Sequence, residues 1–512
     1  MVIPLDYKHF DGSPSQQRTI VIGGGFGGIS AALRCRALGH QVILVERLKK
    51  LGGRAQVFER NGFRHDAGPT VITAPFLFEE LFELYGENLH DHLTFVPLSP
   101  WYRFYFHDGQ TFDYSNDWEA MRREIDRFSP DDVEGYEKLV EASRRFFEVG
   151  FTKLAHQPFT RFSTMISQLP ALVHLRADRT VSSLVAKHIR HPLLRRAFSI
   201  QPLLVGGNPF ATTSIYSLIH YLEKKWGVYF CMGGTGAIVD ALTRLMQRHG
   251  IKVLTGADVS QINMTDKKVS GVTLDDGSKL ESDHIICNAD PPVVYQEMLK
   301  GGRLARRAKR PLPESMTKYS MGLFVLFFGS QKQYPDVAHH TIWLGSRFRE
   351  LLADIFDRKK LPSDFSLYIH RPTATDPDFA PPGCDSFYVL CPVPNLQANI
   401  DWEIVGQDLR DRIVKALSST ILPNLGDHIT EEFWMDPTDF HTNYRSRHGA
   451  GFSIAPIFRQ SAWFRYHNRD PHIDNLYFVG AGTHPGAGLP GVISSAKVVE
   501  TLISEQQAAE PK

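Results

Sequence analysis

A glycine-rich turn between two short apolar runs near the start of the chain constrains the fold more than any other feature. Residues 19–22 form a β-branched run that is typical of a buried strand in a parallel sheet. A GxGxxG pattern follows directly, and residues 29–38 then predict a helix that ends at Gly39. A second apolar run, residues 41–45, ends in Glu46. Strand, helix, strand and terminal acid in this order predict a βαβ unit that binds a dinucleotide.

Each residue of the pattern has a physical role in such a unit. Gly23 permits the tight turn out of the strand, and Gly25 has no side chain to block a pyrophosphate. Gly28 lets helix and strand approach closely, and the free N–H groups at the helix start bind phosphate. Glu46 is placed to accept hydrogen bonds from ribose hydroxyls. The alternative is a plain glycine-rich turn, which the complete unit around the pattern disfavours.

The next stretch carries further glycine and charged residues. The motifs LGGR at 51–54 and DAGPT at 66–70 resemble those of the flavin amine oxidases and carotenoid desaturases, which bind FAD. The resemblance implies a charge-assisted bond from Arg54 to a cofactor phosphate, and passage of residues 66–69 near the isoalloxazine ring. The alternative for Arg54 is a surface arginine after a turn. The cofactor-binding residues predicted in this stretch are Arg47, Gly53, Arg54, Gly68, Pro69 and Thr70.

A second candidate cofactor segment lies in the middle of the chain. Residues 232–250 predict an amphipathic helix with a glycine start and a glycine stop, and short strands are predicted at 251–254 and 258–262. A hairpin and a further strand with a polar end follow. This order resembles the second FAD-binding segment of the superfamily. The resemblance implies that main chain near Val259 meets the adenine, and we add Asn288 and Asp290 as predicted cofactor residues.

The glycine-rich residues 233–236 resemble a second nucleotide-binding loop. They do not follow a hydrophobic strand, and no βαβ unit lies downstream of them. We therefore expect no NAD(P)H site. Direct reduction by NAD(P)H is then not expected, and oxygen or a quinone is the expected electron acceptor.

The third candidate segment lies near the C-terminus. An apolar run from residue 475 ends in Gly480, and a glycine-rich loop leads to a helix predicted to start near Gly491. The helix N-terminus would direct positive partial charge at the flavin N1/C2 edge. A surface glycine loop is the alternative. The resemblance implies that FAD binds non-covalently, and the loop contains no cysteine of the kind that often links FAD covalently in amine oxidases. The predicted cofactor residues here are Gly480, Gly482, Gly491 and Val492.

Longer motifs narrow the resemblance. Residues 68–73 (GPTVIT), 203–210 (LLVGGNPF) and 480–491 (GAGTHPGAGLPG) resemble those of the bacterial-type phytoene desaturases, and the similarity runs from about residue 18 to 502. It implies stepwise desaturation of 15-cis-phytoene toward neurosporene or lycopene, with hydride transfer to flavin N5. It also implies a cytoplasmic protein associated peripherally with the inner face of the cell membrane.

The expected fold is α/β. A Rossmann-like FAD-binding domain is split over three segments, with an interleaved mixed-sheet substrate domain and a helical, membrane-facing subdomain. The predicted divisions are a mobile tail at 1–17, FAD-binding segments at 18–94, 231–290 and 471–505, and substrate segments at 95–230 and 291–470.

A hydrocarbon substrate requires an apolar tunnel, and aromatic residues between the cofactor segments are candidates for its wall. Ordinary core packing is the alternative for each of them. The candidates are Trp101, Tyr102, Phe104, Tyr105, Phe106, Phe146, Phe147, Phe151, Phe159, Phe162, Phe210, Tyr216 and Trp226.

Two stretches are candidates for membrane contact. Residues 151–189 alternate apolar and basic side chains, and residues 300–310 form a basic run. A solvated helix face is the alternative for the basic run.

Catalytic and metal-binding candidates are few. The resemblance implies that Glu141 and Arg144 form an acid–arginine pair near the flavin, although a surface ion-pair ladder is an open alternative. His339, His340 and His484 are of a type that binds metals, but adjacent histidines point in different directions on a strand or helix, and no Cys/His cluster supports them. No metal is predicted.

Composition excludes several classes of protein. The 512 residues carry 57 Lys and Arg against 56 Asp and Glu, which argues against nucleic-acid binding. Five cysteines without a CxxC pair suit a reducing compartment. No apolar run is long enough to cross a bilayer. The open alternatives are a hydroxyneurosporene-type desaturase, a carotenoid isomerase, an amine oxidase, and a lipid-binding escort protein for prenylated GTPases, which lacks flavin chemistry.

Overall fold

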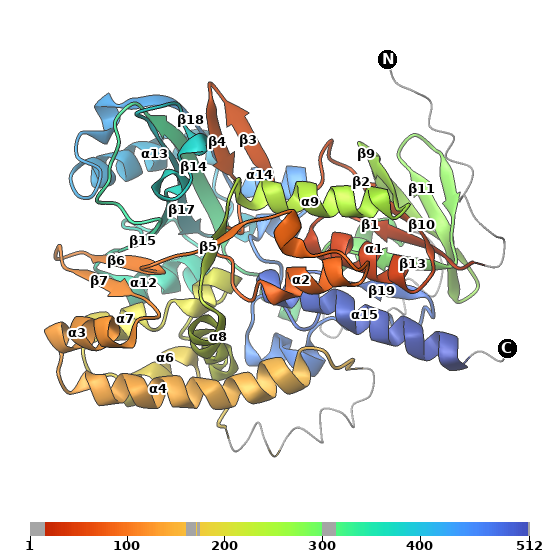
Figure 1. The fold of residues 1–512 in the computed structure, drawn as a ribbon, viewed down its shortest axis with the longest axis horizontal. Coiled ribbons are helices and arrows are strands. Elements are labelled where there is room, and N and C mark those ends of the chain that lie inside the picture. The colour runs from red at the N-terminus through yellow and green to blue at the C-terminus, as the bar shows by residue number, and fades with distance from the viewer. Residues whose placement is uncertain (1–15, 160–169, 171–174, 300–313, 510–512) are drawn as a thin grey trace.

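The computed structural model describes residues 16–159, 170, 175–299 and 314–509 (Figure 1). Most of the predicted tail lies outside the described residues. Phe162 of the tunnel candidates and the whole basic run at 300–310 also lie outside the described residues.

A five-stranded sheet gathers three distant parts of the chain. Its strand order is β19-β13-β1-β2-β9, and all four neighbouring pairs are parallel. The first strand of the chain thus lies between β2 and a strand some 260 residues later. A parallel sheet agrees with the Rossmann-like fold predicted for the cofactor-binding part, with helices packed on one face and the strands of residues 259–281 on the other. The strands are β1 Arg18–Ile22, β2 Gln41–Glu46, β9 Lys252–Thr255, β13 His284–Cys287 and β19 Leu476–Phe478.

Helices cover this sheet. α1 packs along α15, the helix that ends the described chain, and also contacts α9 (Figure 1). α1 begins at Phe26, earlier than predicted, so Gly28 lies inside its first turn. A Cβ on Gly28 would stand 1.9 Å from the carbonyl oxygen of Gly23, so only glycine fits there. The helices are α1 Phe26–Ala37, α2 Phe76–Glu83, α9 Gly234–Arg248 and α15 Leu489–Ala509.

A seven-stranded mixed sheet forms the second body of the molecule. Its order is β18-β14-β17-β16-β15-β6-β7, and only β15 and β6 pair in parallel. β14 is buried along its whole length, which explains its continuous apolar sequence. The chain between and after its strands forms three helices, α12 Phe348–Ala353, α13 Trp402–Ser418 and α14 Pro437–Tyr444. The strands are β6 Tyr102–Phe106, β7 Thr111–Tyr114, β14 Gly322–Ser330, β15 His340–Leu344, β16 Leu367–His370, β17 Asp385–Val393 and β18 Ile429–Met435.

A group of helices lies beside the mixed sheet (Figure 1). α4 packs against α8 and α6, and buried aromatic side chains fill the space between these helices and β6 and β7. The helices are α3 Trp118–Phe128, α4 Asp132–Phe147, α6 Val181–His188, α7 Pro192–Ala197 and α8 Leu218–Trp226. Among the described residues, no helix combines the length and the apolar character needed to cross a bilayer.

Three small sheets complete the fold. β10, β11 and β12 form an antiparallel sheet beside the parallel sheet, where the sequence predicts a hairpin. Two short pairs, β3 with β4 and β5 with β8, connect the two bodies. Their bounds are β3 Val57–Arg60, β4 Phe63–Asp66, β5 Phe95–Pro97, β8 Tyr229–Cys231, β10 Val259–Thr265, β11 Lys268–Leu274 and β12 Lys279–Glu281.

Candidate active site

One cavity of about 540 Å³ reaches from the glycine turn after β1 to an apolar region between the mixed sheet and the helices. Nearly all of the predicted cofactor residues line it, although they come from three distant segments. The exceptions are Gly28, which packs against Gly23, and Gly482, which packs against Pro291. The predicted residues that line it are Gly23, Gly25, Glu46, Arg47, Gly53, Arg54, Gly68, Pro69, Thr70, Val259, Asn288, Asp290, Gly480, Gly491 and Val492.

The turn after β1 is held open by hydrogen bonds to β2. Gly23 has a φ of +95°, which favours glycine, and its N–H donates to the carbonyl of Val45 at 2.8 Å. The Glu46 carboxylate accepts hydrogen bonds from the N–H of Gly24 (2.7 Å) and of Leu48 (2.8 Å). Burial raises the pKa of Glu46, and the hydrogen bonds from the backbone N–H groups offset part of that rise. These bonds orient Glu46 at the cavity wall.

Asn288 lies directly beneath this turn at the end of β13. A Cβ on Gly25 would stand 2.9 Å from its Nδ2, and one on Gly27 would stand 2.5 Å from its Oδ1. The first residues of α1 therefore contact the end of β13 with no space for side chains. The N-terminus of α1 begins at Gly25 without any side-chain cap, so its N–H groups are available for a phosphate.

Arg54, the cationic group predicted to bind a cofactor phosphate, lines the cavity. Its Nη2 donates to Ser446 Oγ at 2.5 Å and lies 3.8 Å from Asp290 Oδ2. Its buried Nε has no hydrogen-bond partner among the described residues. A buried cationic donor without a partner fits a site that takes an anionic group. The residues present therefore fit the pyrophosphate of FAD.

The C-terminal glycine loop forms another wall of the cavity. Gly480 donates its N–H to Ser495 Oγ at 2.8 Å, and Gly486 and Gly488 have φ values of +137° and +92°. α15 begins at Leu489, and its first turn lines the cavity. The N-terminus of α15 therefore directs its positive partial charge toward the cavity, and its place at the flavin edge stays a prediction. Burial lowers the pKa of His484 in this loop to about 3, so its ring is neutral.

The apolar part of the cavity has mainly aliphatic walls. Of the aromatic candidates, Phe151 and Tyr216 line the cavity, and the other described ones pack elsewhere, mostly in the core between helices and sheet. The sequence did not reveal the lining residues because isolated Leu and Ile side chains look the same in a core and in a tunnel. They include Ile200, Leu203, Leu204, Ile215, Leu218, Ile219, Leu222, Met321, Leu323, Ile342, Leu344 and Leu390.

One carboxyl group, which the sequence reading missed, also lines the cavity. Glu223 on α8 is fully buried, and Tyr102 donates its hydroxyl hydrogen bond to Glu223 Oε1 at 2.8 Å. Burial raises the pKa of Glu223 to about 8, so the group is mostly protonated at neutral pH. An acid in the basic, polar stretch that ends α8 resembles any surface helix residue, so only packing identifies it.

Glu141 and Arg144 lie on an exposed face of α4 and are not among the residues that line the cavity. Arg144 donates from Nε and Nη2 to the Glu141 carboxylate at 2.8 Å and also pairs with Glu148. Arg145 pairs with Glu141 one turn along. The structure thus contains the surface ion-pair ladder that the sequence left open as the alternative, and it gives no support to a catalytic role.

Residues 233–236 follow a short strand after all, β8, which corrects the sequence analysis. β8 pairs with β5 and not with the parallel sheet, so β8, α9 and β9 do not form a βαβ unit. The N–H of Thr235 donates to Asp66 Oδ2 at 3.1 Å, and that of Gly233 donates to Asp376 Oδ2 at 2.7 Å. Carboxylates of the chain itself therefore occupy the N-terminus of α9.

The expectation that His339 and His340 point apart is wrong. Their ring centroids lie 4.6 Å apart. His339 precedes β15 in a bend, and the alternation of a strand does not apply to it. The geometry of these two residues therefore does not exclude a metal.

Comparison with known proteins decides the family. A family model described as flavin containing amine oxidoreductase matches residues 26–499. The chain belongs to this family. Members bind a flavin, in agreement with the cavity described above, and FAD is the cofactor of this chain.

Two curated relatives within the family resemble the chain over nearly their whole length. A phytoene desaturase (lycopene-forming) of Pantoea ananas is 46% identical to this chain, and the alignment covers 95% of this chain and 99% of the relative. A phytoene desaturase (neurosporene-forming) of Rhodobacter capsulatus is 39% identical, with 95% of this chain and 94% of the relative covered.

Solved structures share the family fold at low identity. An oxidoreductase from Methanosarcina mazei has a TM-score of 0.63 at 17% identity, with 94% of this chain and 100% of that one covered. Cyclohexylamine oxidase from Brevibacterium oxydans has a TM-score of 0.60 at 17% identity, with 96% and 100% covered. At this identity the likeness concerns the fold alone.

Proposed function

We propose that the chain is an FAD-dependent oxidoreductase that desaturates 15-cis-phytoene in steps, toward neurosporene or lycopene, by hydride transfer to flavin N5. The observation that carries the proposal is the single cavity that joins the glycine turn of a flavin site to a long aliphatic wall. The names and near-complete coverage of the curated relatives support the same reaction class.

The chain's own residues bind and orient the cofactor. The N-terminus of α1 and Arg54 would hold the pyrophosphate, and Glu46 would hold the ribose, each as predicted from the sequence. Bound FAD supplies the hydride acceptor. The segments around Gly68 and Gly480 would lie against its ring, since both line the cavity that also has the apolar wall.

The apolar wall would position a hydrocarbon without polar anchoring. Moving such a molecule from lipid into an apolar cavity gains little free energy, so selection must come from the length and shape of the cavity. The carboxyl on this wall, Glu223, is held mostly neutral at pH 7, which is compatible with an apolar substrate. The wall would hold the chain of the substrate in line with the flavin.

We place the protein on the inner face of the cell membrane, because its substrate dissolves in the bilayer. Phe458 is 43% exposed and begins a loop in which Ser461 and Ala462 line the cavity. An exposed aromatic beside a cavity wall is suited to contact lipid. Oxygen or a quinone is the proposed electron acceptor, because Asp66 and Asp376 already occupy the backbone donors of the second glycine loop.

The test is incubation of the FAD-loaded protein with phytoene in liposomes, followed by the absorption spectrum of the extract. Each new double bond lengthens the chromophore, so we expect bands that shift to longer wavelength with time and that identify the product. An unchanged spectrum with FAD bound and an acceptor present would contradict the proposal. Flotation of the protein with the same liposomes tests docking, and protein left in the soluble fraction would exclude it.

A pair of glycine variants tests whether colour formation depends on bound FAD. Gly28→Ala should abolish FAD binding and colour formation, because its methyl group would clash with the carbonyl of Gly23. Gly426→Ala adds the same methyl group where the nearest atom is 3.9 Å away, and it should keep both.

A further inference from the structure

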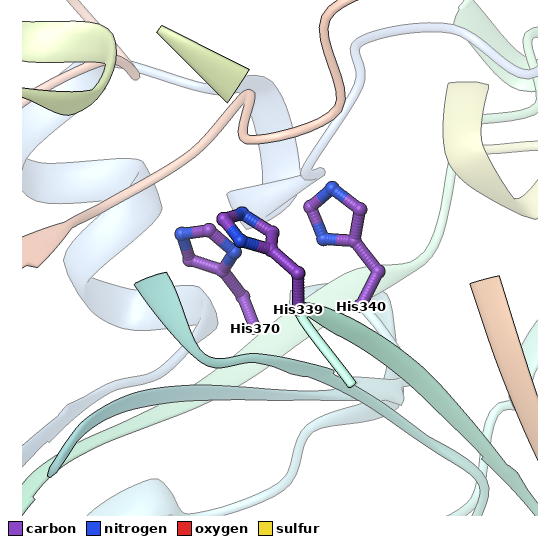
Figure 2. A group of neighbouring side chains, drawn as sticks. All are labelled: His339, His340 and His370. Carbon is purple, nitrogen blue, oxygen red and sulfur yellow. The ribbon is translucent and has the colours of Figure 1, made fainter. Parts of the chain in front are cut away.

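Three buried histidines project to the same side of two neighbouring strands of the mixed sheet (Figure 2). His340 on β15 is the register partner of His370 on β16, and His339 immediately precedes β15. The ring centroids are 4.6 Å apart for His339 and His340, 4.9 Å for His339 and His370, and 5.3 Å for His340 and His370. One ring nitrogen from each lies within 4.8 Å of the other two.

In two of these rings, a hydrogen bond holds the Nδ1 atom and so fixes the orientation of the ring. His339 Nδ1 lies 2.7 Å from Thr375 Oγ1, and His340 Nδ1 lies 2.8 Å from the hydroxyl of Tyr368. The Nε2 atoms of both rings are buried without a hydrogen-bond partner among the described residues, and neither nitrogen of His370 makes a bond of normal geometry. Metal-binding histidines are typically arranged so, with one nitrogen held by an oxygen and the other left for the ion.

The surroundings of the cluster suit ligation. An imidazole nitrogen that is buried without a hydrogen-bond partner is costly unless a bound ligand takes its lone pair. Phe230 packs against His339, with centroids 4.7 Å apart, and helps to exclude water.

The geometry points to a metal site: we propose that His339, His340 and His370 together bind one divalent transition-metal ion, with zinc the favoured class. Three imidazoles without a carboxylate ligand select zinc or its transition-metal neighbours over magnesium or calcium. Thr375 and Tyr368 act as positioning residues that orient two of the ligands.

The site is linked to the cavity through one side chain. The Tyr368 hydroxyl that contacts His340 also lies 2.6 Å from Thr70 Oγ1, and both Tyr368 and Thr70 line the cavity. A bound ion would join β15 to β16 and hold Tyr368 at the cavity wall. The proposal does not depend on the desaturase reaction, and its test measures metal rather than turnover.

The experiment uses the FAD-loaded, full-length protein produced in medium with added zinc, because a buried site exchanges metal slowly. After desalting, zinc and FAD are measured together, and we expect about one zinc per FAD. X-ray absorption at the zinc edge should give imidazole scattering and Zn–N distances of about 2.0–2.1 Å. Protein with full FAD and only traces of zinc, or zinc bound by oxygen alone, would overturn the proposal.

Matched variants distinguish this site from adventitious binding. His370→Asn removes a ligand and should lose the zinc, while Thr375→Val should weaken its affinity roughly 10–100-fold in competition with a chelator. His220→Asn alters a buried histidine outside the cluster, whose ring lies 2.9 Å from the carbonyl of Phe198, and should keep the zinc. Equal zinc content in all three variants would refute the site. If His370→Asn fails to bind FAD, the Thr375→Val and wild-type measurements still decide.

Discussion

Glu223 illustrates how a single side chain can make the stability of this protein depend on pH. Its carboxyl is fully buried beside Tyr102, and burial raises its pKa to about 8 from an ordinary value of 4.5. An acid with a raised pKa stabilises the folded state fully below pH 4.5, and this contribution is lost as the pH rises toward 8, because the unfolded chain ionises first.

We predict that Glu223→Gln removes this dependence while preserving the shape and the bond from Tyr102. Between pH 4 and pH 7, the free energy of unfolding of the wild type should fall by about 3 kcal/mol relative to that of the variant. Chemical denaturation at a series of pH values, with FAD bound in both proteins, measures the difference. The exposed Glu505→Gln serves as control and should follow the wild type. Parallel curves for the wild type and Glu223→Gln would show that the carboxyl is not held neutral.

At the scale of an element, α4 presents two different faces. Tyr136, Leu139 and Phe146 pack into the aromatic core, whereas Glu141 and Arg144 lie on the solvent side in an ion-pair ladder. Exposed pairs of this kind contribute little to stability and are screened by salt.

We expect Glu141→Gln to retain FAD and full turnover in the liposome assay, since the residue does not line the cavity. Leu139→Ala, on the buried face of the same helix, is the contrasting variant. It should lower the free energy of unfolding by about 2–5 kcal/mol. A Glu141→Gln protein that binds FAD but fails to turn over would return this residue to the catalytic candidates.

The elements differ in how far the sequence could predict them. The βαβ unit and the C-terminal glycine loop were predictable, because Gly23, Gly28 and Gly480 occupy backbone positions that other residues cannot. The cavity wall was not, because its Leu and Ile side chains come from several elements whose packing has no local signature. His370 joins the histidine cluster only through the register of β15 with β16, which no local pattern specifies.

At the scale of the whole molecule, the cofactor site is complete only when all three segments meet. The glycine loop after β19 and the first turn of α15 supply one wall of the cavity, and α15 also covers α1. A chain that ends at Asp470 should therefore fail to retain FAD, although it keeps the glycine turn, Glu46 and Arg54. Gel filtration followed by flavin absorbance measures this, and a chain that ends at Ala509 is the control. Stoichiometric FAD in the shorter chain would contradict the three-segment site.

The position of β1 in the sheet has a consequence for folding kinetics. β1 pairs with β2 on one side and on the other with β13, which lies some 260 residues later and pairs in turn with β19. The entropy of closing such long loops is lost before the distant strands gain their contacts, so a parallel sheet of this kind forms slowly. FAD uptake during refolding should therefore be slow and should follow assembly of the sheet.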